Sequence, residues 1–339
     1  MAKSSARRSV GLEVDTGSVR AVEMAGKAGA PKLVTLGSIT LPEEAVNEGL
    51  VMQPKVVGAA LKELWSRAGL KERSVLLGVS NQGVLVRYIT IPKVSSDKLK
   101  NAVIFKAQEQ LPIALNSVVL DYLVLGEIEG SGEAPVELEI LLVAARLDMI
   151  NNYMEALSEA NLEALDIDVS SMAMLQLLPQ KLMNMTVALV NIANGLNSIL
   201  ISNKGKPYLA RLGMVKIDDL AEGLGCSLDE VFSSRLYKKE ESSRLLESWV
   251  NRLASEVRSS ITYYQDQTHL SRVEGVLLSG RGALFGSMPA MIENYLNMPV
   301  RIFNPLKEYN PAQRNMLHTD QEAVEYTISA GLACRGLEG

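Results

Sequence analysis

The chain of 339 residues has few of the residues that build metal centres and disulfides, with only two cysteines and two histidines. Cys226 and Cys334 lie far apart and lack metal-ligand spacing, which predicts reduced thiols and neither a disulfide nor a metal site. His269 and His318 have no plausible second ligand in the sequence, so a zinc site is not expected. The sequence therefore predicts no metal-binding residue.

Excess positive charge and long apolar runs are also missing. The net charge is −5 with a pI of about 5.4, which gives no electrostatic basis for binding nucleic acid. No run approaches the ~18 apolar residues of a membrane span. Lys3, Arg7 and Arg8 make a basic start, but Glu13 and Asp15 interrupt the apolar stretch that follows, so no signal peptide is expected. The composition, 47% hydrophobic and 22% charged, predicts a soluble globular protein with two or more domains.

One strand–turn–strand pattern occurs twice in the sequence. Residues 10–24 place apolar segments on both sides of a short polar turn, and residues 187–201 repeat this arrangement. In each copy a third apolar segment follows a proline, Pro31 or Pro207. A duplicated hairpin predicts two similar lobes that face each other across a cleft, with the two turns binding the phosphates of a nucleotide.

Apolar periodicity predicts the remaining elements. Before the second repeat we expect helices at 56–65, 95–110 and 149–160 and strands at 75–79, 85–91, 118–125, 136–145 and 165–169, with a polar loop at 126–135. The apolar side of the second helix is expected to hold Leu99, Val103, Phe105, Ala107 and Leu111. The order strand-helix-strand-strand-helix-strand predicts a small α+β unit inserted in the first lobe. After the second repeat we expect helical segments at 220–239, 243–265, 287–296 and 322–332 and strands at 275–278 and 300–303.

The first hairpin turn has more of the residues needed to bind phosphate and magnesium than the second. Thr16, Gly17 and Ser18 are small enough for backbone N–H groups to approach phosphate oxygens. Glu13 or Asp15 could hold a hydrated magnesium ion near the first turn.

In the second turn Asn194 suits a tight bend, but Asn191 stands where a carboxylate would be expected. An ordinary hairpin with Gly and Asn at positive φ explains either turn alone equally well. The two copies together favour an inherited nucleotide cleft.

A third turn, residues 279–283, follows a predicted buried strand. Gly280 and Gly282 would let a nucleoside lie against the backbone, although many strand–helix junctions carry this pattern. Glu256 and Arg252 on the long helix could reach a ribose, but a solvated helix face is the more common reason for such a pair.

These motifs resemble the PilM family, the cytoplasmic actin-like components of type IV pilus assembly, which are similar to the cell-division protein FtsA. The likeness runs from about residue 10 to 337 and is most specific in the inserted unit, at 85–92, 105–112 and 119–125. It implies an α/β, two-lobed actin-like (ribonuclease H-like) fold with an inserted α+β subdomain in the first lobe. The domains so implied are a first lobe at 9–92 and 170–185, a subdomain at 93–169, a second lobe at 186–337 and a disordered tail at 1–8.

This sequence departs from the family pattern at the nucleotide positions. Against the family's Gly-Ile-Asp-Ile-Gly-x-x-Ser-Val-Lys turn, it places Glu13 at the Asp, Asp15 at the second Gly and Arg20 at the Lys. Asn191 replaces the Asp of the second turn, and Arg281 interrupts the third turn's glycines, although Arg20 and Arg281 could offset the repulsion of phosphates. The implied ATP and magnesium are therefore not expected to support hydrolysis. The candidate nucleotide-binding residues are Glu13, Asp15, Thr16, Gly17, Ser18, Arg20, Asn191, Asn194, Glu256, Gly280, Arg281 and Gly282, and no catalytic residue is predicted.

The resemblance implies a scaffold at the cytoplasmic face of the inner membrane, without insertion into it, among other proteins of the pilus assembly platform. Its partner would be the N-terminal tail of a PilN-like membrane protein, bound as an extended peptide between the first lobe and residues 93–169. The contact residues, a homo-oligomer and the choice between pilus and secretion machinery stay open.

An active actin-like ATPase or sugar kinase is the alternative function, which Asn191 and Asp15 disfavour. An FtsA-like membrane filament would need a C-terminal amphipathic helix, for which residues 334–339 are too short and too polar.

Overall fold

The computed structural model describes residues 7–27, 29–129, 135–233, 235–268, 270–285, 287–306 and 322–338. Most of the expected N-terminal tail, the middle of the expected loop at 126–135 and both histidines lie outside these residues. Among the described helices, none combines the length and apolar character required to cross a bilayer.

Both expected hairpins are confirmed, and each forms the centre of a five-stranded sheet. The first sheet has the order β10-β6-β1-β2-β3, and the second has the order β13-β12-β11-β14-β15. Read from opposite ends, the two sheets are equivalent, since in each an antiparallel hairpin is extended by two parallel strands. The first sheet contains β1 (Arg8–Asp15), β2 (Ser18–Lys27), β3 (Ala30–Thr40), β6 (Ser74–Val79) and β10 (Glu163–Val169). The second contains β11 (Thr186–Asn191), β12 (Asn197–Asn203), β13 (Lys206–Gly213), β14 (Gly275–Ser279) and β15 (Val300–Ile302).

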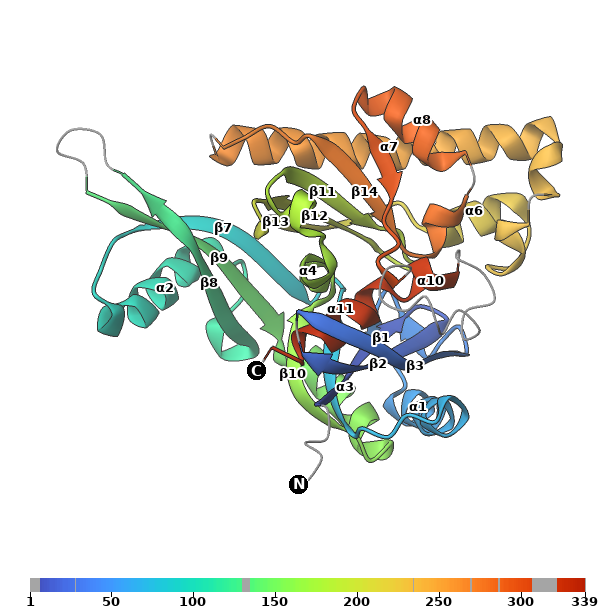
Figure 1. Cartoon of the computed structure of the whole chain (residues 1–339), viewed down its shortest axis with the longest axis horizontal. Helices are drawn as coiled ribbons and strands as arrows, with labels where there is room; N and C mark the ends of the chain where they lie inside the picture. Colours follow the sequence, from blue (N-terminus) through green and yellow to red (C-terminus); the bar gives the residue numbers. More distant parts are fainter. Residues whose placement is uncertain are drawn as a thin grey trace.

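Helices cover the sheets in layers (Figure 1). The outer face of the first sheet packs on α1 (Pro54–Ala68) and α3 (Leu147–Glu159), and that of the second on α6 (Ile217–Leu224), α7 (Glu240–Thr268) and α8 (Met288–Leu296). Between the sheets lie α4 (Ser170–Ala173) and α11 (Thr327–Arg335), whose apolar side chains join residues of both sheets in one core. The two lobes are thus connected by a shared apolar layer as well as by the chain.

The packing of α11 on the first sheet requires a glycine. A Cβ on Gly11 of β1 would lie 2.0 Å from the carbonyl oxygen of Ser329 and 2.5 Å from the nitrogen of Ala333. Neither atom can move without moving the helix backbone, so the sheet and α11 approach more closely than any side chain would permit.

The elements of the inserted unit occur in the expected order, but its sheet does not contain the last expected strand. Its sheet is β7-β9-β8, formed by β7 (Val84–Pro92), β8 (Val118–Ile128) and β9 (Glu137–Arg146), with α2 (Ser96–Gln110) on one face. The strand expected to close this unit, β10, instead pairs in parallel with β6 of the first sheet. The reason is that α3 buries its apolar side, including Tyr153 and Leu157, in the first-lobe core and so delivers β10 to that sheet.

Three further expectations need correction. The segment 220–239 is not one helix, because Gly225 (φ 64°) ends α6 and short 3₁₀ turns follow at Glu230–Phe232 and Leu236–Lys238. The final helix is interrupted at Tyr326, between α10 (Glu322–Glu325) and α11. Phe105 is 65% exposed. It lies about 200° around the helix from Val103, which faces the sheet.

A short hairpin, β4 (Val46–Asn47) and β5 (Leu50–Val51), precedes α1. Its bend holds Glu48 with φ 49° and Gly49 with φ 78°. The carbonyl of Gly49 accepts hydrogen bonds from the buried side chains of Asn81 and Tyr153, which attach this bend to the first lobe.

Candidate functional site

The second and third predicted turns form one unit, because β11 and β14 are parallel neighbours that end side by side at Asn191 and Ser279. The Ile192 amide donates to the Ser279 carbonyl at 2.8 Å, and the Gly282 amide donates to the Ile192 carbonyl at 3.0 Å. Gly280 has φ 78°, and a Cβ there would lie 2.6 Å from Oδ1 of Asn191. The glycine is therefore required by the contact between the turns, whether or not a nucleoside binds.

The first and second turns contact each other directly across the two lobes. The Asp15 carboxylate accepts hydrogen bonds from the backbone amides of Asn194 at 3.1 Å and Gly195 at 3.4 Å, and from its own neighbour Thr16 at 2.8 Å. In return, Nδ2 of Asn194 donates to the Thr16 carbonyl at 3.0 Å. A Cβ on Gly195 would lie 2.6 Å from Oγ1 of Thr16, which shows how closely the turns pack.

Arg20, on β2 beside the first turn, is a buried cation among three carboxylates. Its guanidinium lies 3.8 Å from Glu13, 3.5 Å from Asp15 and 3.8 Å from Glu325 of α10. Glu13 and Arg20 are direct partners in the β1–β2 ladder, which places their side chains on the same face. The network therefore holds more negative than positive charge.

Burial, together with this excess of negative charge, shifts the pKa values in the network. Burial raises the pKa of Glu13 to about 7, against the opposing effect of Arg20 and with further raising by Asp15 and Glu325. Burial alone would lower the pKa of Arg20, but Glu13, Asp15 and Glu325 outweigh it, so the net shift is upward. Arg20 stays charged, and Glu13 is the member of the network that takes up a proton near neutral pH.

Arg281, at the third turn, is also engaged by carboxylates. It donates to Asp229 at 2.5 Å and lies 3.9 Å from Glu325, and its guanidinium stacks 4.5 Å from the ring centroid of Phe232. Since Glu325 also contacts Arg20, the structure brings the first and third turns together through one carboxylate.

Glu256, the candidate ribose contact, is committed elsewhere. It accepts hydrogen bonds from the backbone amides of Met214 at 2.9 Å and Val215 at 3.4 Å, just after β13. Arg252, its neighbour on α7, pairs with Asp219 at 2.7 Å. Both side chains stabilise the end of β13 and the start of α6.

Four charged residues at the contact between the lobes had no signal in the sequence, namely Glu48, Lys216, Asp218 and Glu325. Lys216, before α6, forms an ion pair with Glu48 of the β4–β5 bend, which is a second link between the lobes. Asp218 is half-buried, and burial followed by the charge of Asp15 raises its pKa to about 6. A clustering of acidic and basic residues from segments distant in sequence is visible only once the lobes are packed.

The residues at the turns do not fit a magnesium triphosphate. The amides that would face phosphate oxygens already donate to Asp15, and Arg20, Lys216 and Arg281 are each paired with carboxylates. Within the described part of the chain, no three His, Cys, Asp or Glu side chains are arranged to hold a metal ion. The hydroxyls of Thr16 and Ser18 and Oδ1 of Asn194 are buried without a hydrogen-bond partner among the described residues, so the contact between the turns is not fully satisfied.

A profile of the family described as type IV pilus assembly protein PilM matches residues 11–337. The chain belongs to the PilM family. A solved structure described as a PilM-PilN type IV pilus biogenesis complex is 24% identical, covers 98% of this chain and 99% of that one, and superposes with a TM-score of 0.83.

Two more distant solved structures confirm the expected α/β actin-like class. The ethanolamine utilization protein EutJ from Carboxydothermus hydrogenoformans is 13% identical over 97% of this chain and 89% of that one, with a TM-score of 0.57. MreB5 of Spiroplasma citri, solved bound to AMPPNP, is 10% identical over 96% of this chain and 94% of that one, with a TM-score of 0.52. These similarities establish the fold.

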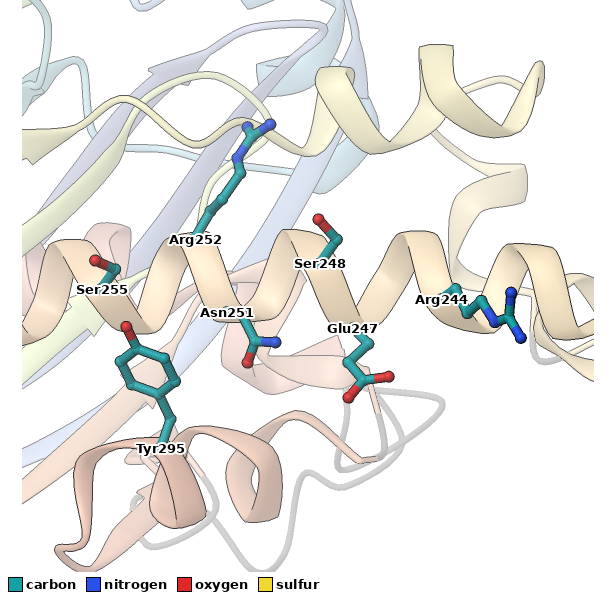
Figure 2. A pocket seen from close by; sticks show the side chains of 7 residues that line it. All are labelled: Arg244, Glu247, Ser248, Asn251, Arg252, Ser255 and Tyr295. Atoms are coloured by element: carbon teal, nitrogen blue, oxygen red, sulfur yellow. The ribbon is translucent and has the colours of Figure 1, made fainter.

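A separate open pocket of about 480 Å³ lies between α7 and the end of α8 (Figure 2). Its lining residues are Arg244, Glu247, Ser248, Asn251, Arg252, Ser255 and Tyr295. Arg252 points away from Glu247, Asn251 and Tyr295 in this view. The two arginines that line the pocket each form an ion pair, Arg244 with Glu240 and Arg252 with Asp219.

Proposed function

We propose that this chain is a non-enzymatic scaffold of the type IV pilus assembly platform, or of a related secretion platform. It would act at the cytoplasmic face of the inner membrane and bind the cytoplasmic tail of a PilN-like membrane protein. The observation that carries the proposal is the likeness to the PilM-PilN complex, which extends over nearly the whole of both chains. Because the match covers 98% of this chain, it includes the inserted unit as well as both lobes.

The free sheet edges support an extended peptide as the occupant. β8 is the last strand of the inserted sheet, and β10 is the last strand of the first sheet. Edge strands present unpaired backbone groups to which a peptide can add as a further strand. Apolar side chains are exposed on these same strands, with Val119 at 49%, Leu123 at 47% and Leu165 at 60%. We therefore assign the walls of the peptide groove to β8 and β10.

A titration with the tail peptide of the neighbouring PilN-like protein tests this assignment. Leu123→Asp and Leu165→Asp should each weaken binding by at least about tenfold, or ~1.4 kcal/mol, because each places a charge in an apolar contact. Ile302→Asp is the matched control, since Ile302 is 44% exposed on β15, the edge strand of the other lobe. Wild-type protein that does not bind the peptide at tens of micromolar would refute the proposal, as would equal weakening by all three variants.

The cleft supports a scaffold over an enzyme. A working ATPase needs a carboxylate to place magnesium and an attacking water, and position 191 holds an amide. The Asp15 carboxylate adds a negative charge where phosphates would bind.

The alternative, an actin-like ATPase, has one observation in its favour, namely the unpartnered hydroxyls of Thr16 and Ser18. ATP turnover by the wild type at ordinary kinase rates would establish it. An Asn191→Asp, Asp15→Gly double variant shows whether the fold regains activity when both groups are restored.

A further inference from the structure

The second turn presents two successive backbone amides, those of Asn194 and Gly195, toward one point between the lobes. Successive N–H groups that converge in this way form a concave site for an anion, often called a nest. In this chain an anion is already there, since both oxygens of the Asp15 carboxylate accept hydrogen bonds at that point. Asp15 belongs to the opposite lobe, so the contact crosses the cleft.

The charge around this contact is arranged to keep Asp15 in place. The Arg20 guanidinium lies 3.5 Å from the carboxylate, and both side chains are buried, Asp15 at 8% exposure and Arg20 at 6%. A buried carboxylate is stable only when hydrogen bonds and a counter-charge replace water. Asp15 has three amide donors and one guanidinium, which meet that requirement.

A phosphate would have to displace this arrangement. It would compete for the amides of Asn194 and Gly195 and so take from Asp15 two of its three amide donors. It would also add negative charge to a network in which Arg20 already faces the carboxylates of Glu13, Asp15 and Glu325. Two further contacts hold the lobes at the same place, the Lys216–Glu48 ion pair and the hydrogen bond from Asn194 to the Thr16 carbonyl.

We propose that Asp15 is an internal ligand of the amide nest, whose carboxylate takes the place of a phosphate and holds the two lobes closed without any bound nucleotide. The nest is a latent anion site for a phosphate or pyrophosphate group, which becomes available when this carboxylate is removed. This inference deepens the proposed scaffold function, because a cleft closed by the chain itself gives a platform whose shape does not depend on nucleotide.

Amide hydrogen exchange and pyrophosphate titration of the full chain test the inference. In the wild type, the Asn194 and Gly195 amides should be protected, and pyrophosphate should not bind. In Asp15→Gly, protection of these two amides should fall by at least about tenfold, and pyrophosphate should bind at least about tenfold more tightly than to wild type and restore the protection. Asp121→Gly is the control, because Asp121 also accepts its neighbour's amide, at 2.8 Å, but within one strand of the inserted sheet.

Unchanged protection of Asn194 and Gly195 in Asp15→Gly would overturn the inference, as would equal pyrophosphate affinity in wild type and variant. Where Asp15→Gly does not fold, Asp15→Asn carries the test, since an uncharged amide oxygen is a weaker acceptor and should also lower protection. A separate titration with the tail peptide tests the proposed scaffold function independently of the contact between Asp15 and the nest. A chain whose nest opens in Asp15→Gly but which does not bind the tail peptide supports the internal ligand and refutes the scaffold.

Discussion

Replacing Glu13 by glutamine should remove a loss of stability that the wild type shows as the pH rises toward neutrality. Burial raises the pKa of Glu13 from 4.5 to about 7 in the folded chain. The folded state therefore keeps a proton that the unfolded chain releases above pH 4.5. Stability from this group is complete below that pH and is lost as the pH rises through about 7.

The size of the effect follows from the two pKa values. Between 4.5 and about 7, at about 1.36 kcal/mol per pKa unit, the wild type should lose about 3 kcal/mol relative to a chain without this titration. Glutamine has the shape of the protonated acid and does not titrate. Arg20 keeps its contacts with Asp15 at 3.5 Å and Glu325 at 3.8 Å, so the variant does not leave the guanidinium unpaired.

Urea denaturation from pH 5 to pH 8 measures this difference. The free energy of unfolding of Glu13→Gln, relative to wild type, should rise across the range by about 2–3 kcal/mol, since part of the difference has already developed below pH 5. Glu127→Gln is the control for the same substitution outside the buried network, because Glu127 is half-exposed in an ion pair with Lys93 of the inserted unit. If the free energies of unfolding of wild type and Glu13→Gln changed with pH in parallel, Glu13 would not be a buried carboxyl with a raised pKa, and the reasoning would be refuted.

Two further predictions concern the packing of the lobes. Gly11→Ala should destabilise the chain by more than about 3 kcal/mol, because its Cβ would lie 2.0 Å from the Ser329 carbonyl oxygen. Thermal denaturation measures this loss, and Gly29→Ala is the control, since a Cβ at Gly29 meets nothing within 4 Å. Tyr208→Phe should cost about 1–2 kcal/mol and speed amide exchange in β13, because the Tyr208 hydroxyl donates at 3.2 Å to Glu139 of the inserted unit. An unchanged melting temperature in the first variant, or unchanged exchange in the second, contradicts the corresponding contact.

The elements of the fold were largely predictable, because each depends on local patterns. The duplicated hairpins, the long amphipathic helix and the strand before the third turn are all present. Pairing was less predictable. The order of elements in the inserted unit was right, but β10 joins the first sheet, because α3 packs on α1 rather than on the inserted sheet. The order of strands and helices along the chain predicts which elements form, but it does not determine which strands pair with one another.

The candidate site shows the same division. Glu13 and Asp15 were identified as carboxylates beside the first turn, and Arg20 was identified from the family pattern. The register of the β1–β2 hairpin then pairs Glu13 with Arg20. Glu325, Lys216 and Glu48 were not, because nothing in their local sequence distinguishes them from ordinary surface charges. Glu256 was chosen for its place on a helix, and its carboxylate caps the amides after β13.

By itself the sequence determined the two hairpins, their polar turns and the family, because strand alternation, turn residues and motif spacing are properties of neighbouring residues. Only the tertiary structure decided that Asp15 fills the amide nest of the opposite turn and that one glutamate joins Arg20 to Arg281. The physical reason is that hydrogen bonds and desolvated charges depend on distances of a few ångströms between segments far apart along the chain.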